Sequence, residues 1–496
     1  MTHRYTPFDE IPVIHASLRT TFRSGLTKAI AWRRHQLLQL ARLFKDNQEA
    51  LASAIHAYLR KPPLEIVLGE ITPVFERALN CASKIQKWSR DESITDQVQD
   101  WQKGCNPRIM RQAKGIVLII APWNYPMILS LQPLYDVVLS SSSPKLPHIT
   151  LRSSPTICRS YLDKGSFRAA LGGVPEITKM LELKWDHIFY SGNGRVARII
   201  ATAAAKHLTP LTLELGGKSP VIIDATADIQ LAAKRTLAGK TTDCGQICVT
   251  PDFVLVERSV ASKFVEACVE VLKGFYLQED HYERLKGLLD RTKGRIVAGG
   301  GMRPEKGIGL TVIADMEPGD SLLERFIRSF DREIFGPFLP IVTVENVAGA
   351  IDYINDHGEM YSDNYWRTVI IHLYLFTTNE ATKTKDKFIV DDESEGSMLE
   401  NTTSGNVCIN DTFTQLSINE MPFGGVGESG YGRQVQYYSY ENFVYGRAVC
   451  KIPFEEEPFH VLRYPSYTAE SVVFFSQVMK TPIPESTNPA EVEVKN

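Results

Sequence analysis

The feature that most constrains the fold is an alternation of short apolar segments with helical stretches through the middle of the chain. Strands are predicted at Gly115–Ala121, Ile149–Leu151, Trp185–Tyr190, Leu211–Leu215 and Ser219–Ile223. Helices are predicted at Ile14–Leu59, Leu64–Trp88, Gly194–His207, Ile229–Leu237, Val260–Phe275 and Val347–Ile354. Strands that alternate with helices favour an α/β fold with a doubly wound parallel sheet.

Size and charge narrow the class of protein. The chain has 496 residues, which at roughly 150 residues per domain predicts about two to four domains. Lys and Arg number 55 against 58 Asp and Glu, a net charge of −3. This balance argues against a nucleic-acid partner. The eleven histidines are dispersed without metal-ligand spacing, so we predict no metal. The sequence also has no G-x-S-x-G nucleophile elbow, which argues against a Ser/His/Asp hydrolase.

The cysteines and the apolar runs bear on the compartment. Eight cysteines are scattered without a C-x-x-C pair, and the first residues form no apolar signal core. No run reaches the roughly 18 apolar residues that a membrane span needs. We therefore predict a cytoplasmic protein without a membrane span. The segment 481–496, rich in Pro, Glu, Ser and Thr, is predicted to be disordered.

A glycine-containing turn follows one predicted strand, in the segment Tyr190–Ala197. Gly192 and Gly194 stand where the strand passes into a helix, so backbone N–H groups and a helix N-terminus can face a phosphate. A plain strand–helix turn explains the same residues, and both interpretations stay open.

Cys248 ends the polar segment Thr242-Asp-Cys-Gly-Gln-Ile-Cys. A thiolate is the reactive form of cysteine, and exposed backbone N–H groups at the start of an element would lower its pKa. This pattern predicts a nucleophile, for which Cys244 competes. A buried structural cysteine is the alternative, since free cysteines are commonly buried.

Three further polar residues stand beside apolar segments. Glu214, inside an apolar strand, is either a base with a raised pKa or a buried structural carboxylate. Asn124, on a loop after a strand, is either an oxyanion donor or a turn asparagine. Glu333 precedes a tight turn and is either functional or an ordinary strand-to-loop boundary.

Taken in order, the motifs resemble those of the aldehyde dehydrogenase superfamily, from about Leu18 to Tyr467. The segments that carry the resemblance are Pro122–Pro126, Gly172–Glu176, Leu213–Lys218, Gly245–Cys248, Glu333–Pro337 and Pro422–Gly427. The separation of 34 residues between Glu214 and Cys248 also matches the family. The Trp-Asn-Tyr-Pro form and the Arg-Tyr-Pro at 463–465 are most similar to class 3, the branch for fatty and aromatic aldehydes.

The resemblance implies an aldehyde dehydrogenase-like fold, with a doubly wound cofactor domain, an α/β catalytic domain and a β bridging flap that builds a homodimer. It assigns 1–213 to NAD(P) binding, with 95–115 contributing to the flap. Residues 214–405 form the catalytic domain, and 406–467 return to the active site and complete the flap.

The resemblance also implies roles for single residues in the oxidation of a small-molecule aldehyde. Cys248 would attack the carbonyl, Asn124 and the Cys248 N–H would hold the oxyanion, and Glu214 would activate the hydrolytic water. Glu333 would hold the nicotinamide ribose, with Phe335 near the ring. The other residues expected to contact NAD or NADP are Trp123, Arg152, Gly192, Asn193, Gly194, Val196, Leu215 and Gly216.

Several departures from the family pattern qualify this picture. Where the family has Lys-Pro-Ser-Glu, this chain has Arg152-Ser-Ser-Pro. An arginine without the acid suits a 2′-phosphate and therefore NADP. The chain is shorter than the family at 155–172 and 276–284, and longer at 324–331, 358–372 and 391–399, through divergence or a mis-spliced gene. The leading prediction is the oxidation of fatty, aromatic or apocarotenoid aldehydes. Two alternatives stay open: a catalytically impaired paralogue, and a cysteine esterase without hydride transfer.

Overall fold

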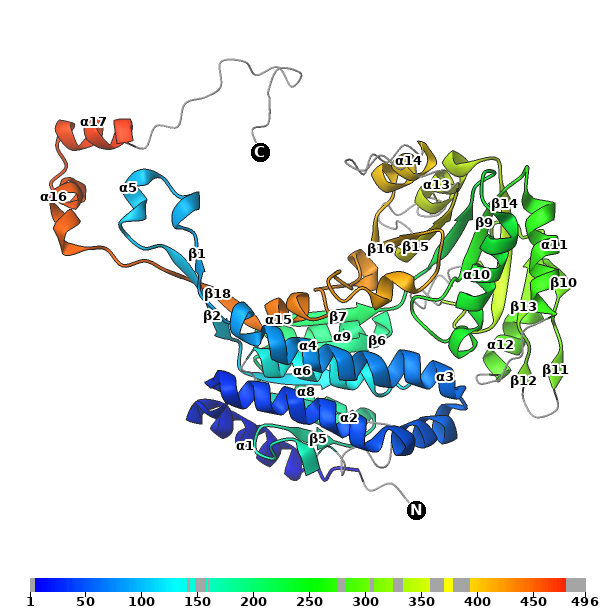
Figure 1. The fold of residues 1–496 in the computed structure, drawn as a ribbon, viewed down its shortest axis with the longest axis horizontal. Helices are drawn as coiled ribbons and strands as arrows, with labels where there is room; N and C mark the ends of the chain where they lie inside the picture. The colour runs from blue at the N-terminus through cyan, green and yellow to red at the C-terminus, as the bar shows by residue number, and fades with distance from the viewer. Residues whose placement is uncertain are drawn as a thin grey trace. The chain divides into compact units, whose positions relative to one another are not determined.

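The computed structural model describes residues 5–140, 143–147, 158, 160–273, 282–303, 307–323, 333–356, 370–377 and 393–478. The chain forms two compact units (Figure 1). The first contains the residues up to Ser89 and the segment Gln112–Tyr445, and the second contains Arg90–Arg111 with the chain from Gly446 onward.

A six-stranded sheet in the first unit carries the N-terminal half of the predicted alternation. Its strands, in spatial order, are β17 (Gly430–Tyr431), β7 (Leu211–Leu215), β6 (His187–Gly192), β3 (Ile116–Ile120), β4 (Ser143–Pro147) and β5 (Arg168–Ala170). All neighbours pair in parallel except β17, which runs antiparallel to β7. The strand predicted at Ile149–Leu151 lies outside the described residues.

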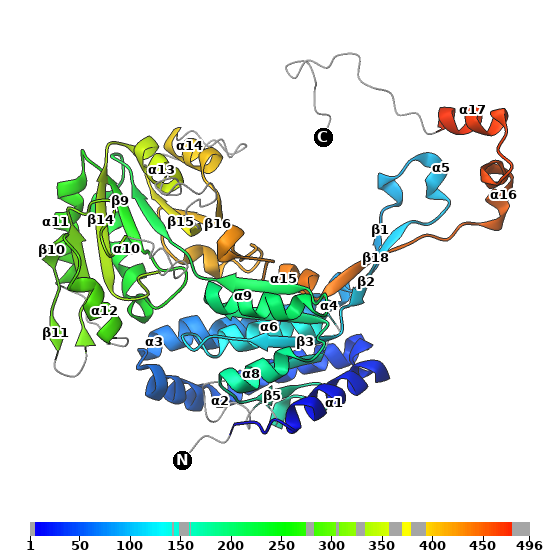
Figure 2. The same cartoon turned by 180° about the vertical axis from the view of Figure 1, so that it is seen from behind.

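Helices cover both faces of this sheet (Figures 1 and 2). One face packs against α2 (Ile30–Leu59), α4 (Thr72–Trp88) and α6 (Ile128–Leu139), and the other against α1 (Glu10–Ser24), α8 (Val174–Leu181) and α9 (Gly194–Ala205). Strand β3 shows why both faces are needed. Val117 and Ile119 enter the first core, whereas Ile116 and Leu118 enter the second. The predicted doubly wound architecture is confirmed.

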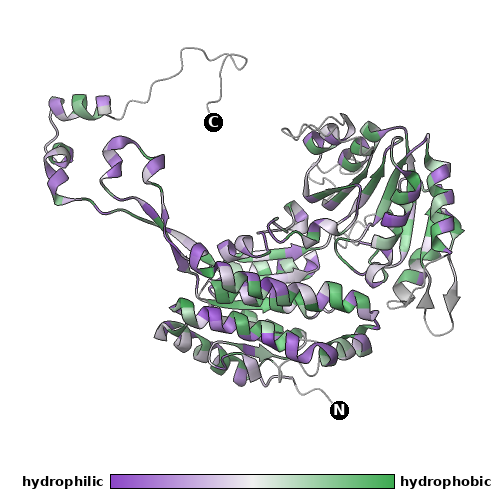
Figure 3. Ribbon diagram, viewed as in Figure 1, coloured by the Kyte–Doolittle hydropathy of each residue, from purple (hydrophilic) through white to green (hydrophobic). Residues whose placement is uncertain are grey.

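A seven-stranded sheet follows in the same unit. Its order is β10 (Arg295–Ala298), β13 (Thr311–Ala314), β14 (Phe338–Val344), β9 (Phe253–Glu257), β8 (Pro220–Ile223), β15 (Ile370–Phe376) and β16 (Ser404–Ile409). Only β10 is antiparallel to its neighbour. Its faces pack against α10 (Ile229–Thr241) and α11 (Ala261–Leu272), and against α12 (Tyr282–Leu289), α13 (Val347–Asp356) and α14 (Glu393–Asn401). Figure 3 colours its central strands as hydrophobic, as burial on both faces requires.

The N-terminal helices are more broken than the sequence predicts. The stretch 14–59 divides where Gly25 adopts a left-handed conformation at φ 81° and ends α1. A short 3₁₀ turn, η1 (Leu26–Lys28), precedes α2. The stretch 64–88 divides into α3 (Pro63–Ile66), a π-helical turn η2 (Val67–Ile71) and α4. The π turn carries the buried Glu70, and such turns occur often at functional sites.

Short elements connect these parts. In the first unit they are η4 (Thr242–Gly245), β11 (Met302–Arg303), β12 (Gly307–Ile308), η5 (Thr414–Ser417), η6 (Gly427–Ser429) and α15 (Tyr437–Asn442). The loop and turn segments at 121–127 and 242–250 bring polar side chains to the site described below.

A three-stranded sheet of order β1 (Glu92–Ser93), β2 (Arg108–Ala113) and β18 (Val444–Val449) supplies the strands of the second unit, with residues 112–113 of β2 and 444–445 of β18 assigned to the first. Its short helices are η3 (Thr95–Gln97), α5 (Asp100–Lys103), η7 (Phe454–Glu456), α16 (Glu457–His460), η8 (Val461–Arg463) and α17 (Ala469–Val478). Within this unit the Lys451 N–H donates to the Cys105 carbonyl at 2.7 Å. Among the described helices, none combines the length and apolar character needed to cross a membrane.

Several predictions fall wholly or partly outside the described residues. Arg152, the segment 324–331 and the tail 481–496 are not described, and the segments 276–284 and 358–372 are described only at their C-terminal ends. Within 155–172, residues 158, 160 and 161 are helical and β5 follows. Within 391–399, helix α14 begins at Glu393.

Candidate active site

Glu214 lies near the end of β7, between β6 and β17. Its side chain is buried, and its Oε1 atom has no hydrogen-bond partner among the described residues. Burial raises the pKa of this carboxyl well above its ordinary value, because a charged carboxylate is poorly solvated there. A carboxylate with a raised pKa is a stronger base than an exposed one, as a general base requires.

Cys248 follows the turn η4, and its environment differs from the sequence prediction. The backbone N–H groups of Cys248 and Val249 do act to lower the pKa of the thiol. Burial outweighs them, and the negative charges of Glu333 and Glu214 raise the pKa further. The expected low pKa is therefore wrong, and the thiol is protonated at neutral pH. Both predicted carboxylates therefore act electrostatically on this sulfur.

The turn that leads to Cys248 has an unusual backbone. Asp243, Cys244 and Gly245 all have positive φ values, of 50°, 53° and 72°. A Cβ atom on Gly245 would lie 2.4 Å from the Gly336 carbonyl oxygen, so only glycine fits this close approach. The two candidate nucleophiles therefore differ. Cys244 has a left-handed backbone conformation, whereas Cys248 is the cysteine whose pKa is affected by the charges of Glu214 and Glu333.

Asn124 is buried on the loop after β3. Its side-chain Nδ2 donates to the Gln246 carbonyl at 2.8 Å, two residues before Cys248. Its own carbonyl oxygen accepts from the Lys61 ammonium at 2.6 Å. A primary amide carries two N–H donors, so one can stay on Gln246 while the other meets a ligand oxygen.

Glu333 meets the loop that leaves β7. Its Oε1 atom accepts from the Gly217 N–H at 2.6 Å, and a Cβ atom on Gly216 would lie 2.8 Å from the same oxygen. Gly216 therefore leaves room for the carboxylate, and burial raises the pKa of Glu333 well above its ordinary value. Leu215, just before these glycines, is buried in the core of the six-stranded sheet.

The two aromatic residues expected near the cofactor contact one another. The rings of Trp123 and Phe335 lie edge to face, with centroids 6.0 Å apart and planes at 79°. Phe335 has a φ of 45°, so the chain turns sharply after Glu333. Residues from the loop after β3 and from the segment before β14 are thereby brought together.

The predicted strand–turn–helix at 190–197 is present. Strand β6 ends at Gly192, and α9 begins at Gly194. The Asn193 side chain caps this helix, with Oδ1 accepting from the Val196 N–H at 3.0 Å. Phosphate binding at this terminus stays a prediction.

A family comparison decides the identity of this arrangement. The profile described as "Aldehyde dehydrogenase family" matches residues 14–359 and 391–449. The chain belongs to the aldehyde dehydrogenase family. The recognition made from the motifs is confirmed, and the chain is an NAD(P)-dependent aldehyde dehydrogenase family enzyme.

Individual relatives agree with this placement. Aldehyde dehydrogenase family 3 member I1, chloroplastic, of Arabidopsis thaliana is 31% identical, and the match covers 96% of this chain and 84% of that protein. The dimeric NADP-preferring aldehyde dehydrogenase of Rattus norvegicus is 32% identical over 91% of this chain and 97% of its own. The solved structure titled "Substrate bound state of Staphylococcus Aureus AldH" has a TM-score of 0.82 at 26% identity, and covers 95% of this chain and 99% of its own.

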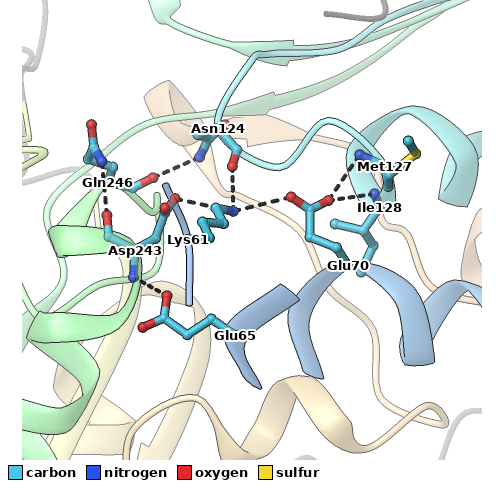
Figure 4. Close-up of polar contacts among 8 residues, drawn as sticks. All are labelled: Lys61, Glu65, Glu70, Asn124, Met127, Ile128, Asp243 and Gln246. Atoms are coloured by element: carbon cyan, nitrogen blue, oxygen red, sulfur yellow. Dashed lines mark hydrogen bonds and ion pairs between the residues drawn. The ribbon is translucent and has the colours of Figure 1, made fainter. Parts of the chain in front are cut away.

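One group in this aldehyde dehydrogenase was missed from the sequence. Lys61, Glu65, Glu70 and Asp243 surround the Asn124 loop and the Cys248 turn (Figure 4). Nothing in the sequence pattern marks Lys61 as buried, since a lysine before two prolines reads as an exposed turn. Within the part of the chain that the structure describes, no group of three or more His, Cys, Asp or Glu residues could hold a metal ion.

Proposed function

We propose that this enzyme oxidises an aldehyde to the carboxylic acid with NAD or NADP, through covalent catalysis by Cys248. The observation that carries the proposal is that two buried carboxyls, Glu214 and Glu333, act on the pKa of one thiol, while the Asn124 amide is fixed on the turn two residues before it. Nucleophile, base and oxyanion donor are the three parts that acyl chemistry on a cysteine requires.

In the first half of the reaction the Cys248 sulfur forms a bond to the carbonyl carbon, and the π electrons move to the oxygen. The second Asn124 N–H and the Cys248 backbone N–H donate to this oxyanion. Because the thiol is protonated at rest, a base must remove its proton as the bond forms. We assign this proton to a water molecule, so that Glu214 stays ionised as the base for the second half of the reaction.

The residues around Glu333 fit the nicotinamide end of the cofactor. With Oε1 held by the Gly217 N–H, Oε2 can accept from a ribose hydroxyl, and the missing Cβ of Gly216 leaves space for this carboxylate. Trp123 and Phe335 supply aromatic surface beside it, and the α9 terminus at Gly192–Gly194 suits the phosphates. A bound NAD or NADP would supply the hydride acceptor here. As the hydride leaves the reacting carbon, the oxyanion electrons re-form the carbonyl and leave a thioester on Cys248.

The second half releases the acid. Glu214 takes a proton from water, and the water oxygen bonds to the carbonyl carbon of the Cys248 thioester. The carbon–sulfur bond then breaks, with its electron pair on sulfur, and the carboxylic acid leaves. The thiol regains its proton before the next cycle.

The proposed substrates are apolar: fatty, aromatic or apocarotenoid aldehydes. Apolar side chains pack together at the Cys248 turn, namely Tyr125, Ile247, Val249, Phe413, Leu416 and Phe423. Arg152 supports NADP as the cofactor, and the dimeric name of the rat relative supports a homodimer. The cytoplasmic location stays a prediction.

A substrate series tests this function. Purified enzyme is mixed with aliphatic aldehydes of increasing chain length and with an aromatic aldehyde, with NAD and NADP in separate reactions. NAD(P)H absorbance should grow, with kcat/KM rising as the chain lengthens. Ester hydrolysis without NAD(P)H formation would replace the proposal with a cysteine esterase, and folded but inactive protein would indicate an impaired paralogue.

A further inference from the structure

Lys61 is a buried cation next to the proposed site. The residue is 2% exposed, and it lies between the end of α2 and the start of α3. Its Nζ atom donates to the Asn124 carbonyl at 2.6 Å and to Glu70 Oε1 at 3.2 Å, and lies 3.4 Å from Asp243 Oδ2 (Figure 4). The same atom lies 3.2 Å from the centroid of the Tyr125 ring. Burial of a charge is expensive unless it is paired and hydrogen-bonded, and this ammonium has three oxygen partners.

Glu70 extends the contact to the far side of the Asn124 loop. Its second oxygen, Oε2, accepts from the backbone N–H groups of Met127 and Ile128, at 2.9 and 3.2 Å. The loop between β3 and α6 is therefore held twice. Lys61 holds the carbonyl of Asn124, and the carboxylate that Lys61 neutralises holds the start of α6.

Asp243 extends the contact to the nucleophile turn. The Asp243 carbonyl accepts from both the backbone N–H and the side-chain amide of Gln246, at 3.0 and 3.1 Å. The Gln246 carbonyl in turn accepts from the Asn124 amide. Lys61, Asn124, Gln246 and Asp243 thus form a closed ring of polar contacts, which Figure 4 shows. Glu65 braces the ring from outside, accepting from the Asp243 N–H at 2.8 Å.

We propose that Lys61 is a positioning residue, whose buried ammonium fixes the Asn124 amide relative to the Cys248 turn. This inference rests on the proposed function, because it assigns Lys61 to the oxyanion donor of that reaction. Lys61 acts through Asn124 and does not itself touch the reacting atoms. Its ammonium donates to Glu70 and to the Asn124 carbonyl and forms an ion pair with Asp243, so one compact cation joins three separate segments, which a planar guanidinium does not reproduce.

A double-mutant cycle between Lys61 and Asn124 tests the proposal. Lys61→Met keeps an unbranched chain of similar length and removes the charge. In the wild-type background it should lower kcat/KM roughly 10- to 100-fold, because small displacements of a catalytic group have effects of that size. KM for the cofactor should change little. In an Asn124→Ala background, where the oxyanion amide is already missing, Lys61→Met should lower kcat/KM less than about twofold further.

Arg33→Met is the matched control. Arg33 is also a buried cation of the first unit, with its guanidinium on the Leu139 carbonyl and on Ser89, away from the ring. Its effect on kcat/KM, through stability alone, should be the same with and without Asn124. Thermal unfolding of each variant is measured first. If Lys61→Met does not fold, Lys61→Met/Asp243→Asn takes its place, because it removes the cation together with one of its carboxylates.

The outcomes distinguish a failure of the Lys61 inference from a failure of the proposed function. Equal loss of kcat/KM in both backgrounds would mean that Lys61 does not act through Asn124, and would overturn the inference while the proposed function stands. A wild-type enzyme that forms no NAD(P)H would overturn the proposed function and the inference with it. Loss in the wild-type background alone supports the positioning role.

Discussion

The side chain of Asn124 donates to the backbone carbonyl of Gln246 at 2.8 Å, across two segments that are 122 residues apart in the chain. Gln246 stands two residues before Cys248, so this one hydrogen bond joins the proposed oxyanion donor to the nucleophile turn. The contact uses one of the two N–H donors of the amide. The other donor is the one that we propose for the oxygen of a bound aldehyde.

Asn124→Ala should lower kcat by about 10²- to 10³-fold, the usual effect of losing one oxyanion donor. The folded protein should lose only about 1 kcal/mol of unfolding free energy, the typical contribution of one hydrogen bond. NAD(P)H formation and urea unfolding measure the two effects. Asn80→Ala removes a comparable contact, to Gln436 at 2.8 Å, and should keep full activity. A fully active Asn124→Ala enzyme would remove Asn124 from the mechanism.

Glu214→Gln should separate acylation from hydrolysis. A glutamine cannot take a proton from water, so the Cys248 thioester should persist after one round of hydride transfer. Rapid mixing is expected to give a burst of NAD(P)H followed by turnover slowed at least about 100-fold, and intact mass spectrometry should detect the acyl group. In the wild type, kcat should rise with pH as the buried carboxyl ionises. Unchanged steady turnover in Glu214→Gln would assign the base elsewhere.

Glu333→Gln should weaken cofactor binding and make the Cys248 thiol more reactive. Hydrogen bonds to charged groups contribute about 1.5 to 3 kcal/mol, so cofactor KM should rise about tenfold or more. The negative charge of Glu333 also raises the pKa of Cys248, so its removal should speed alkylation of Cys248 by iodoacetamide. Peptide mass mapping follows this reaction, and the exposed Glu345→Gln is the control. Slower alkylation would contradict the placement of Glu333 beside the sulfur.

Asp243 should make stability depend on pH. Burial raises the pKa of this carboxyl to about 8, against the lowering effect of Lys61, and the negative charges of Glu70 and Glu65 raise it further. Between the ordinary pKa of about 3.9 and about 8, the folded chain binds more protons than the unfolded chain. The stability contributed by this group is therefore present at low pH and is lost as pH rises through 8.

The test is Asp243→Asn, which removes the titration. The Tm of this variant minus the wild-type Tm should become more positive from about pH 5 to about pH 9. Differential scanning fluorimetry measures it, with Asp315→Asn as the control, since Asp315 is an exposed partner of Arg295. A difference that stays constant with pH would show that the buried Asp243 is ionised throughout.

The sequence predicted the sheets better than it predicted the site. Strand β7 has the predicted bounds of 211–215, because a short, largely apolar run flanked by Pro210 and two glycines is typical of a buried strand. The division at Gly25 was missed, since the hydrophobic period continues across it. Motifs drew attention to Asn124, Glu214 and Cys248, but the raised pKa of the thiol follows from its burial in the folded chain and from Glu333, which is 85 residues further along. The burial of Lys61 could not be predicted, because its partners Glu70, Asn124 and Asp243 meet only in the folded chain.

The most direct test of the account compares Cys248→Ala with Cys244→Ala. Both variants receive the preferred aldehyde with NAD and with NADP, after cofactor binding has been checked by fluorescence titration. The account predicts that Cys248→Ala binds cofactor but forms no NAD(P)H, whereas Cys244→Ala keeps the activity. Residual dehydrogenase activity in Cys248→Ala, or its loss only in Cys244→Ala, would contradict the assignment of the nucleophile.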